Sequence, residues 1–399
     1  MKSKLIALAL FAFTATTVAL LPAYQSAGGI TPADPPIVNP VANEQSRIDV
    51  VFVLDTTGSM GGLIQAAREK IWSIATTMAS AQSAPEIRMG LVAYRDRGDT
   101  YVTRVVDLSS DLDSMYATLM DFQASGGGDG PESVNQALHD AVNKISWSQD
   151  TGTYKVVFLV GDAPPHMDYQ NDVKYPVTLS AATEKGIVVN AIQCGRASGT
   201  TPAWQQIARL GDGHYFQVEQ AGGAVAIATP FDDKIAKLSA KLDDTRLYYG
   251  TVEEKEKQQR KLAATDKLHA AASVESRARR AAFNSSKSGA ANFLGDGELV
   301  DAVTSGRVDL SSIDKDKLPE PMQAMSPEEQ EVIISETAER RNELKRQISE
   351  LTGERSAYLD KKVDEAGGAR DSLDDKIYRA VREQAGILGM TYEADVPAY

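Results

Sequence analysis

The sequence RIDVVFVLDTTGSMG occupies residues 47–61 of the chain. Its apolar run, residues 50–54, has the length and the β-branched content of a strand that is buried on both faces of a sheet. An acid and several small polar residues follow, and from residue 63 to 80 the apolar side chains recur at helical spacing. These residues therefore predict a strand, a tight loop and a helix.

Three polar side chains of this loop, Asp55, Thr57 and Ser59, stand at alternate positions. Alternate side chains of such a loop can converge on one point above the carboxyl end of the strand, where open α/β sheets bind ligands. One carboxylate and two hydroxyls at that point suit a hard cation such as Mg2+, which prefers oxygen ligands. Capping of the following helix is the simpler alternative.

Two later segments carry acids at comparable places. Residues 125–133 read SGGGDGPES, and a helical pattern begins at residue 134, so that Asp129 lies in a glycine-rich loop before a helix. Residues 154–160 form a second buried apolar run, which ends in Gly161 and Asp162. Asp162 is therefore expected at the carboxyl end of a strand.

Together these segments resemble the metal-ion-dependent adhesion site of von Willebrand factor type A domains. Asp55, Thr57 and Ser59 match the family's Asp-x-Ser/Thr-x-Ser motif, and Asp162 matches the acid of its last motif. The family usually has a threonine ligand in the glycine-rich loop, whereas this chain has Asp129 at about that position. Asp129 would bind the metal directly, hold a ligating water or cap the helix. The resemblance covers residues 46–242, and the sequence GDAPPH at residues 161–166 also resembles the bacterial branch of the family.

The predicted elements give an α/β fold with a doubly wound, mostly parallel sheet. Residues 87–94 and 101–106 form a predicted hairpin that adds one antiparallel strand at an edge. Asp96 and Asp99 follow the first strand of this hairpin, and they would either rim the metal site or form an acidic turn in solvent.

The resemblance implies a divalent-cation-dependent protein-binding module. Thr57 and Ser59 would ligate Mg2+, or else Mn2+ or Ca2+, with Asp55 and Asp162 bound directly or through water. An acidic side chain of a partner protein would then bind to the cation. A metal-assisted hydrolase with Asp55 or Asp129 as base is the enzymatic alternative, although the four histidines form no ligand cluster. A cell-envelope assembly factor that acts through its helices is a further alternative.

Composition limits the other possibilities. The 399 residues, 42% of them hydrophobic, suggest about two domains with a sizeable core. The net charge of −13 argues against nucleic acid as the main partner, because the 55 acids outnumber the 42 lysines and arginines that could neutralise phosphates. The single cysteine, Cys194, excludes an internal disulfide framework.

The two ends of the chain differ from its centre. Residues 1–27 predict a signal peptide, because two lysines precede an apolar run and small residues follow it. The run is almost long enough to span a membrane, so an uncleaved anchor is the alternative, and either one implies a periplasmic or extracellular protein. Residues 28–45 are Pro-rich and predict a linker, and the resemblance predicts a type A domain over 46–242. The charged, Ala-rich residues 243–399 predict a helical region, with helices over 252–280, 326–365 and 372–385.

Overall fold

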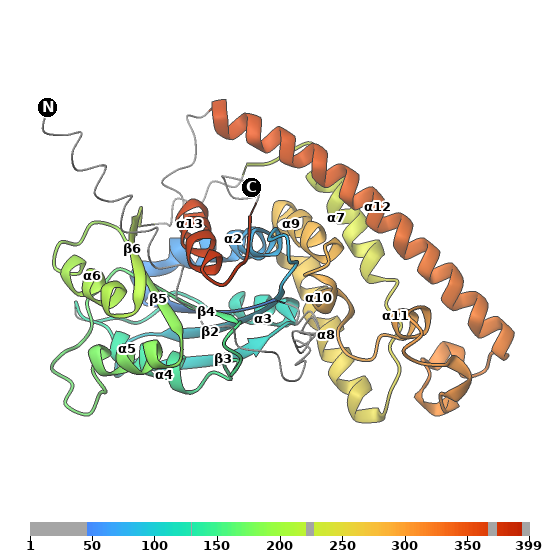
Figure 1. Ribbon diagram of the computed structural model, residues 1–399, viewed down its shortest axis with the longest axis horizontal. Coiled ribbons are helices and arrows are strands. Elements are labelled where there is room, and N and C mark those ends of the chain that lie inside the picture. Colours follow the sequence, from blue (N-terminus) through green and yellow to red (C-terminus); the bar gives the residue numbers. More distant parts are fainter. Residues whose placement is uncertain (1–45, 129, 221–226, 366–372, 393–399) are drawn as a thin grey trace, which may run out of the picture. The chain divides into compact units, whose positions relative to one another are not determined.

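The computed structural model describes residues 46–128, 130–220, 227–365 and 373–392 (Figure 1). All of them belong to one compact unit, Gln45–Tyr399. The predicted signal peptide, the linker and Asp129 lie outside the described residues. Among the helices that are described, none combines the length and the apolar character that crossing a membrane requires.

The centre of the fold is a six-stranded sheet with the strand order β3-β2-β1-β4-β5-β6 (Figure 1). Neighbouring strands are parallel except β2 and β3, which form the antiparallel edge pair. The predicted sheet is thereby confirmed. The strands are β1 Arg47–Asp55, β2 Glu86–Tyr94, β3 Thr103–Ser109, β4 Tyr154–Gly161, β5 Ile187–Cys194 and β6 Asp212–Val218.

The register of the central strands places the predicted site. β1 lies between β2 and β4, and Leu54 pairs with Val160, while Asp55 pairs with Tyr94. Because these strands are parallel, their carboxyl ends meet at one edge of the sheet, and the loops that carry Asp55 and Asp162 begin side by side. The inner strands are buried on both faces, which explains their continuous apolar sequences.

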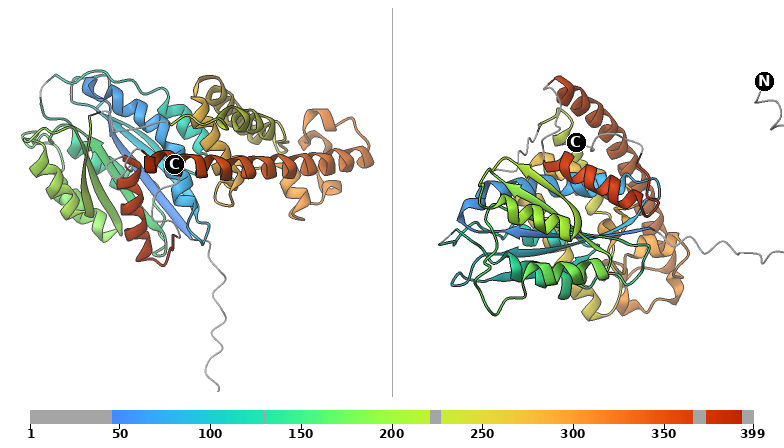
Figure 2. Two further views of the ribbon diagram at one scale, coloured as in Figure 1. Left: turned by 90° about the horizontal axis from the view of Figure 1, so that it is seen from above. Right: turned by 60° about the vertical axis from the view of Figure 1, so that its left-hand side comes forward.

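Helices cover both faces of the sheet (Figure 2). One face packs on α4 Val134–Asn143, α5 Tyr175–Glu184 and α6 Thr201–Leu210. The other face packs on α2 Gly61–Ala79, α3 Leu112–Leu119 and α13 Leu373–Gly386. The short helix α3 is absent from the sequence prediction. Its N-cap is Asp111, whose carboxylate accepts a hydrogen bond from the Ser114 amide.

The helical region follows β6 and returns to the sheet with α13. It contains α7 Asp232–Asp243, α8 Val252–Ala271, α9 Val274–Ser285, α10 Ala290–Leu294, α11 Leu299–Thr304 and α12 Pro327–Glu365. The single helix predicted over 252–280 is wrong, because Ser273 accepts a hydrogen bond from the Ser276 amide and starts a new helix. The predicted start of α12 is confirmed by a reciprocal pair of bonds between Ser326 and Glu329.

The hydrophobic core continues across the predicted domain boundary at residue 242. The rings of Phe283 in α9 and Trp72 in α2 have centroids 6.0 Å apart. The Tyr154 hydroxyl donates to Gln384 of α13 over 2.6 Å. The boundary stays a prediction from sequence, and the two regions share one core on the α2 face of the sheet.

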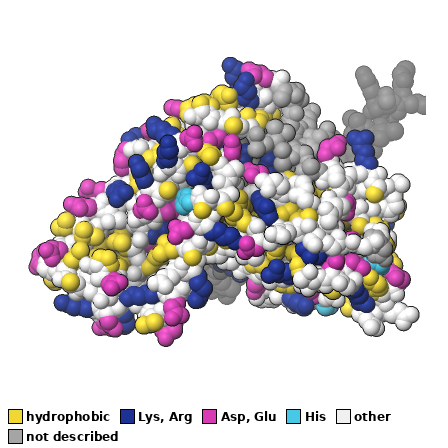
Figure 3. All heavy atoms as spheres, turned by 180° about the vertical axis from the view of Figure 1, so that it is seen from behind, with side chains coloured by type: hydrophobic (Ala, Val, Ile, Leu, Met, Phe, Trp, Pro, Cys, Tyr) yellow, Lys and Arg dark blue, Asp and Glu magenta, His cyan; other side chains and the backbone are white. Residues whose placement is uncertain are grey.

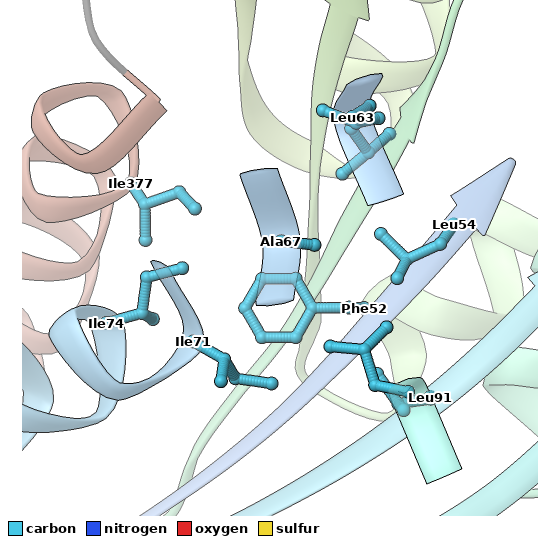
Figure 4. A pocket seen from close by; sticks show the side chains of 10 residues that line it. Phe52, Leu54, Leu63, Ala67, Ile71, Ile74, Leu91 and Ile377 are labelled. Atoms are coloured by element: carbon cyan, nitrogen blue, oxygen red, sulfur yellow. The ribbon is translucent and has the colours of Figure 1, made fainter. Parts of the chain in front are cut away.

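A small apolar cavity lies within this core (Figure 4). Its walls include Phe52 of β1, Ile71 and Ile74 of α2, and Ile377 of α13. With a volume of about 20 Å³ and only apolar lining, it is a packing gap between α13, α2 and the sheet rather than a ligand site.

The surface drawn in Figure 3 mixes both signs of charge. Acidic and basic side chains of the described residues lie among each other on that face, so no large basic surface is seen there. This agrees with the acidic composition of the chain.

Candidate metal centre

Asp55 is the last residue of β1, and its side chain is fully buried. Its Oδ1 accepts hydrogen bonds from the Thr57 amide, at 2.8 Å, and from the Thr57 hydroxyl, at 2.7 Å. Its Oδ2 is buried without a hydrogen-bond partner. Burial raises the pKa of Asp55 to about 7, and the nearby charge of Asp162 adds to the rise, against the lowering effect of the Thr57 bonds. One oxygen thus holds the loop, and the other needs a positive or donating group.

The two hydroxyls of the motif lie above this carboxylate. Thr57 Oγ1 is 3.4 Å from Ser59 Oγ, because the 3-10 turn η1, Gly58–Met60, brings alternate side chains of the loop together. Thr57 is buried and Ser59 is exposed. The site is therefore closed at the strand end and open to solvent at Ser59.

Asp162 follows β4 and lies beside Asp55, as its place at a strand end predicts. It is half-buried, and its Oδ2 accepts a hydrogen bond from Gln220 Nε2 at 2.7 Å. The structure therefore brings Asp55, Thr57, Ser59 and Asp162 into one region at the carboxyl edge of the sheet.

Glu132 is a fifth side chain of this region, and it is not among the site residues predicted from sequence. Only 4% of its surface is exposed, and its Oε2 is buried without a hydrogen-bond partner. Burial, followed by the charges of Asp55, Asp96, Asp99 and Asp162, raises its pKa to about 9. An acid two residues before a helix usually signals favourable helix-terminus electrostatics, so sequence alone gave no reason to single it out.

Glycine is required in the loop that covers this carboxylate. Gly126 and Gly127 have φ values of 81° and 78°, in the left-handed region that favours glycine. A Cβ on Gly127 would lie 3.2 Å from Glu132 Oε1 and 3.3 Å from Thr57 Cβ. The glycine loop therefore lets the backbone approach both the β1 loop and Glu132.

Asp96 and Asp99 lie near the site and brace its loops. Asp96 accepts hydrogen bonds from Ser133 Oγ, at 2.8 Å, and from the Tyr169 hydroxyl, at 2.7 Å. Asp99 Oδ2 accepts from the Gly127 amide at 3.0 Å. Only 6% of Asp96 is exposed, so a turn in solvent is the wrong description of it.

His166 also has structural contacts. Its Nδ1 lies 2.8 Å from Asp168 Oδ1, and its ring stacks on Tyr169 with centroids 4.0 Å apart. Its Nε2 is 3.4 Å from an Asp96 oxygen. These contacts tie the loop after β4 to the loop after β2.

The donor set fits a hard cation. Among the described residues, no group of three or more His, Cys, Asp or Glu side chains has the arrangement of a metal cage. The donors here are instead carboxylates combined with hydroxyls, and two of the carboxylates, Asp55 and Glu132, have a buried oxygen without a partner. A cation that accepts mixed oxygen ligands would satisfy both.

Residues 49–230 match the family model of the von Willebrand factor A domain. This segment is a von Willebrand factor A domain. Such domains commonly mediate protein–protein interaction through a metal site. The A domain includes all six strands and every residue proposed for the metal site, whereas the helices from α7 onward lie beyond the match.

Two curated relatives share part of the A domain. The chain is 27% identical over 124 residues to the ariadne-like RING finger protein R811 of Acanthamoeba polyphaga mimivirus, covering 31% of this chain and 12% of that protein. It is 27% identical over 121 residues to alpha-protein kinase vwkA of Dictyostelium discoideum, covering 30% of this chain and 19% of that protein. The chain thus matches less than a fifth of the length of either relative.

Solved structures of similar segments include the SpRpn10 VWA domain and proximal thread matrix protein 1 from the mussel byssus with a zinc-occupied MIDAS motif. The first has a TM-score of 0.34 and 14% identity, covering 44% of this chain and 88% of that one. The second has a TM-score of 0.34 and 18% identity, covering 44% of this chain and 42% of that one. Similarity of this extent carries no functional argument.

Proposed function

We propose that this protein is an exported, divalent-cation-dependent protein-binding module of the adhesion type. The observation that carries the proposal is Asp55, whose Oδ2 is buried and unpartnered below the hydroxyls of Thr57 and Ser59. Leaving a buried carboxylate oxygen without a partner costs stability unless a ligand satisfies it. A cation provides the positive charge that this oxygen lacks.

Asp55, Thr57, Ser59 and Asp162 would hold the cation, and Asp129 remains a proposed ligand outside the described residues. Mg2+, Mn2+ and Ca2+ all accept carboxylate and hydroxyl oxygens. Bound there, the ion supplies a positive charge at the carboxyl edge of the sheet. The exposure of Ser59 leaves that edge accessible to a partner.

The partner that this chemistry favours is a protein with an exposed acidic side chain. The net charge of the chain is −13, and Asp96 and Asp99 add negative charge beside the site. An anionic group would therefore be repelled at long range, and it would bind only where the cation offsets that field. Binding should depend steeply on the metal.

Export is also part of the proposal, because residues 1–27 have the sequence pattern of a signal peptide. If this segment is not cleaved, it would anchor the protein in a membrane.

The cation is tested first by thermal unfolding of the full chain in chelator and in Mg2+, Mn2+ or Ca2+. A hundredfold excess of cation over its Kd should stabilise the fold by about 2.7 kcal/mol. Asp55→Asn should abolish this shift, and Asp168→Asn, at an exposed acid, should leave it intact. Identical melting curves in chelator and in all three cations would contradict the metal site.

The partner is tested by selecting phage-displayed peptides on the immobilised protein in Mn2+. Selected peptides should contain Asp or Glu, should lose binding in chelator, and should lose it when that acid is changed to its amide. Binders that persist in chelator would place recognition elsewhere on the chain. Metal-dependent hydrolysis of phosphoesters or peptides by the purified protein would instead show an enzyme.

A further inference from the structure

The backbone of Glu132 is fixed by the loop that also carries Asp162. The Glu132 amide donates to the Pro164 carbonyl over 2.9 Å, and the His166 amide donates to the Glu132 carbonyl over 3.1 Å. These two bonds make a short parallel bridge between Glu132 and Pro165. Glu132, two residues before α4, is thus joined to the loop after β4, although some thirty positions separate the two segments in sequence.

The Glu132 side chain extends from this bridge toward the β1 loop. A Cβ added to Gly127 would lie 3.2 Å from Glu132 Oε1 and 3.3 Å from Thr57 Cβ, so both side chains lie close to this glycine. The side chain is 4% exposed, and its Oε2 is buried without a partner. Glu132 therefore presents a carboxylate to the same region as Asp55 and the Thr57 hydroxyl.

The surroundings of this carboxylate do not compensate its charge. The charged groups that act on it most strongly are Asp55, Asp96, Asp99 and Asp162, all of them acids. Buried carboxylates in folded proteins are normally paired with a cation or satisfied by hydrogen bonds. Asp96 and Asp99 have such bonds from the surrounding loops, whereas Glu132 Oε2 has none.

We propose that Glu132 is a ligand of the site cation, supplied by the loop before α4. This inference rests on the proposed cation site and names a residue that the adhesion-site motif does not predict. The Glu132 and Asp55 carboxylates then bind the ion together with the Thr57 and Ser59 hydroxyls, and Asp162 acts on it directly or through water. The ion joins these loops at the edge of the sheet, and Glu132 takes the place of one coordinated water.

The test measures Mn2+ binding to the chelator-treated full chain by titration calorimetry. Glu132→Gln should weaken binding at least about tenfold, the scale on which even an indirect partner of a metal site acts. Asp99→Asn is the matched control, because it removes a nearby negative charge and keeps an oxygen that can accept from the Gly127 amide. It should weaken binding much less than Glu132→Gln does.

A second readout separates ligation from a structural role. Water-proton relaxation reports the number of waters bound to Mn2+, and this number should rise in Glu132→Gln at saturating metal. If Glu132→Gln does not fold, Glu132→Asp, which withdraws the carboxylate by one methylene, should give the same two changes in smaller measure. Wild-type affinity and hydration in the folded Glu132 variant would overturn the inference. If the wild-type chain binds no Mn2+, the proposed cation site itself fails.

Discussion

The α-carbon of Gly161 faces the carboxylate of Asp55 across two neighbouring strands. A Cβ on Gly161 would lie 3.0 Å from Asp55 Cβ and 3.2 Å from Asp55 Oδ2, and it would overlap the Tyr94 hydroxyl. Tyr94 is the last residue of β2 and is fully buried. The absence of a side chain at residue 161 therefore allows Asp55 and Tyr94 to occupy the strand ends together.

The first prediction is that Gly161→Ala destabilises the protein and displaces Asp55. Adding a methyl group to this packed site should cost about 1–3 kcal/mol, measured by denaturant unfolding in chelator. Gly128→Ala is the control, because a Cβ there meets nothing within 4 Å. Equal stability of the two variants would show that the strand ends adjust freely.

The second prediction is that Asp55→Asn stabilises the protein in the absence of cation. The buried carboxylate has one oxygen without a partner, and burial disfavours its charged form. The amide keeps an oxygen that accepts from Thr57, and it carries no charge. At pH 8 in chelator, the free energy of unfolding should rise by about 1–3 kcal/mol. A decrease would show that the charge of Asp55 is compensated without metal.

The sequence predicts the sheet well because its inner strands are buried on both faces and therefore read as unbroken apolar runs. Asp55, Thr57 and Ser59 are close in sequence, and a local motif describes their convergence. Asp162 follows from its place at a strand end. These features depend on local sequence and on the parallel topology alone.

What the sequence does not predict depends on contacts between distant segments. Glu132 is directed toward Thr57 by its bridge to the loop after β4, which no local pattern encodes. Helix α3 has only eight residues, too few for a clear helical period. The break between α8 and α9 depends on the single cap Ser273. The packing of α13 on the sheet brings together residues that are more than two hundred positions apart.

The third prediction concerns acid, and it rests on a buried ion network between the A domain and the helices. Arg280 of α9 is fully buried and contacts one acid on each of two other helices. Its Nε donates to Oδ1 of Asp113 in α3 over 2.7 Å, and its Nη1 donates to Oδ2 of Asp243 in α7 over 2.6 Å. Burial alone would raise the pKa of each acid. The Arg280 guanidinium outweighs that effect together with its neighbours, Arg246 and His269 at Asp243, and Lys261 and Arg246 at Asp113. The pKa of Asp243 is lowered to about 2, and that of Asp113 lies far below its usual range.

Because the folded-state pKa values are depressed, the network stabilises the fold fully above pH 4 and loses this contribution as pH falls toward 2. Thermal unfolding from pH 7 to pH 2 should show the loss below pH 4. In Asp243→Asn the neutral-pH stability should be lower and the acid-dependent loss smaller. Asp314→Asn, at an acid of the exposed Lys317 pair, should follow the wild type. A parallel pH dependence in Asp243→Asn and wild type would contradict this role.

The last prediction is that α13 is part of the folded A domain. Gln384 accepts a hydrogen bond from the Tyr154 hydroxyl at 2.6 Å and exchanges two bonds with Asn190, at 3.0 and 2.8 Å, so that a helix from the end of the chain satisfies buried polar groups of β4 and β5. A chain ending at residue 365 would leave these groups unpaired and expose the apolar face that α13 covers, since Ile377 and Val381 are buried there. We expect the chain ending at residue 365 to bind a hydrophobic dye and to unfold at a lower temperature. Fragment 46–242, which also lacks α8 to α12, should be less stable still. Gln384→Ala in the full chain should cost about 1–3 kcal/mol through the groups that lose their partners. Gln347→Ala should cost little, because this half-buried residue of α12 bonds only to Glu343 in an exposed contact. A chain ending at residue 365 with wild-type stability and no dye binding would show that the sheet, α2 and α3 suffice without α13.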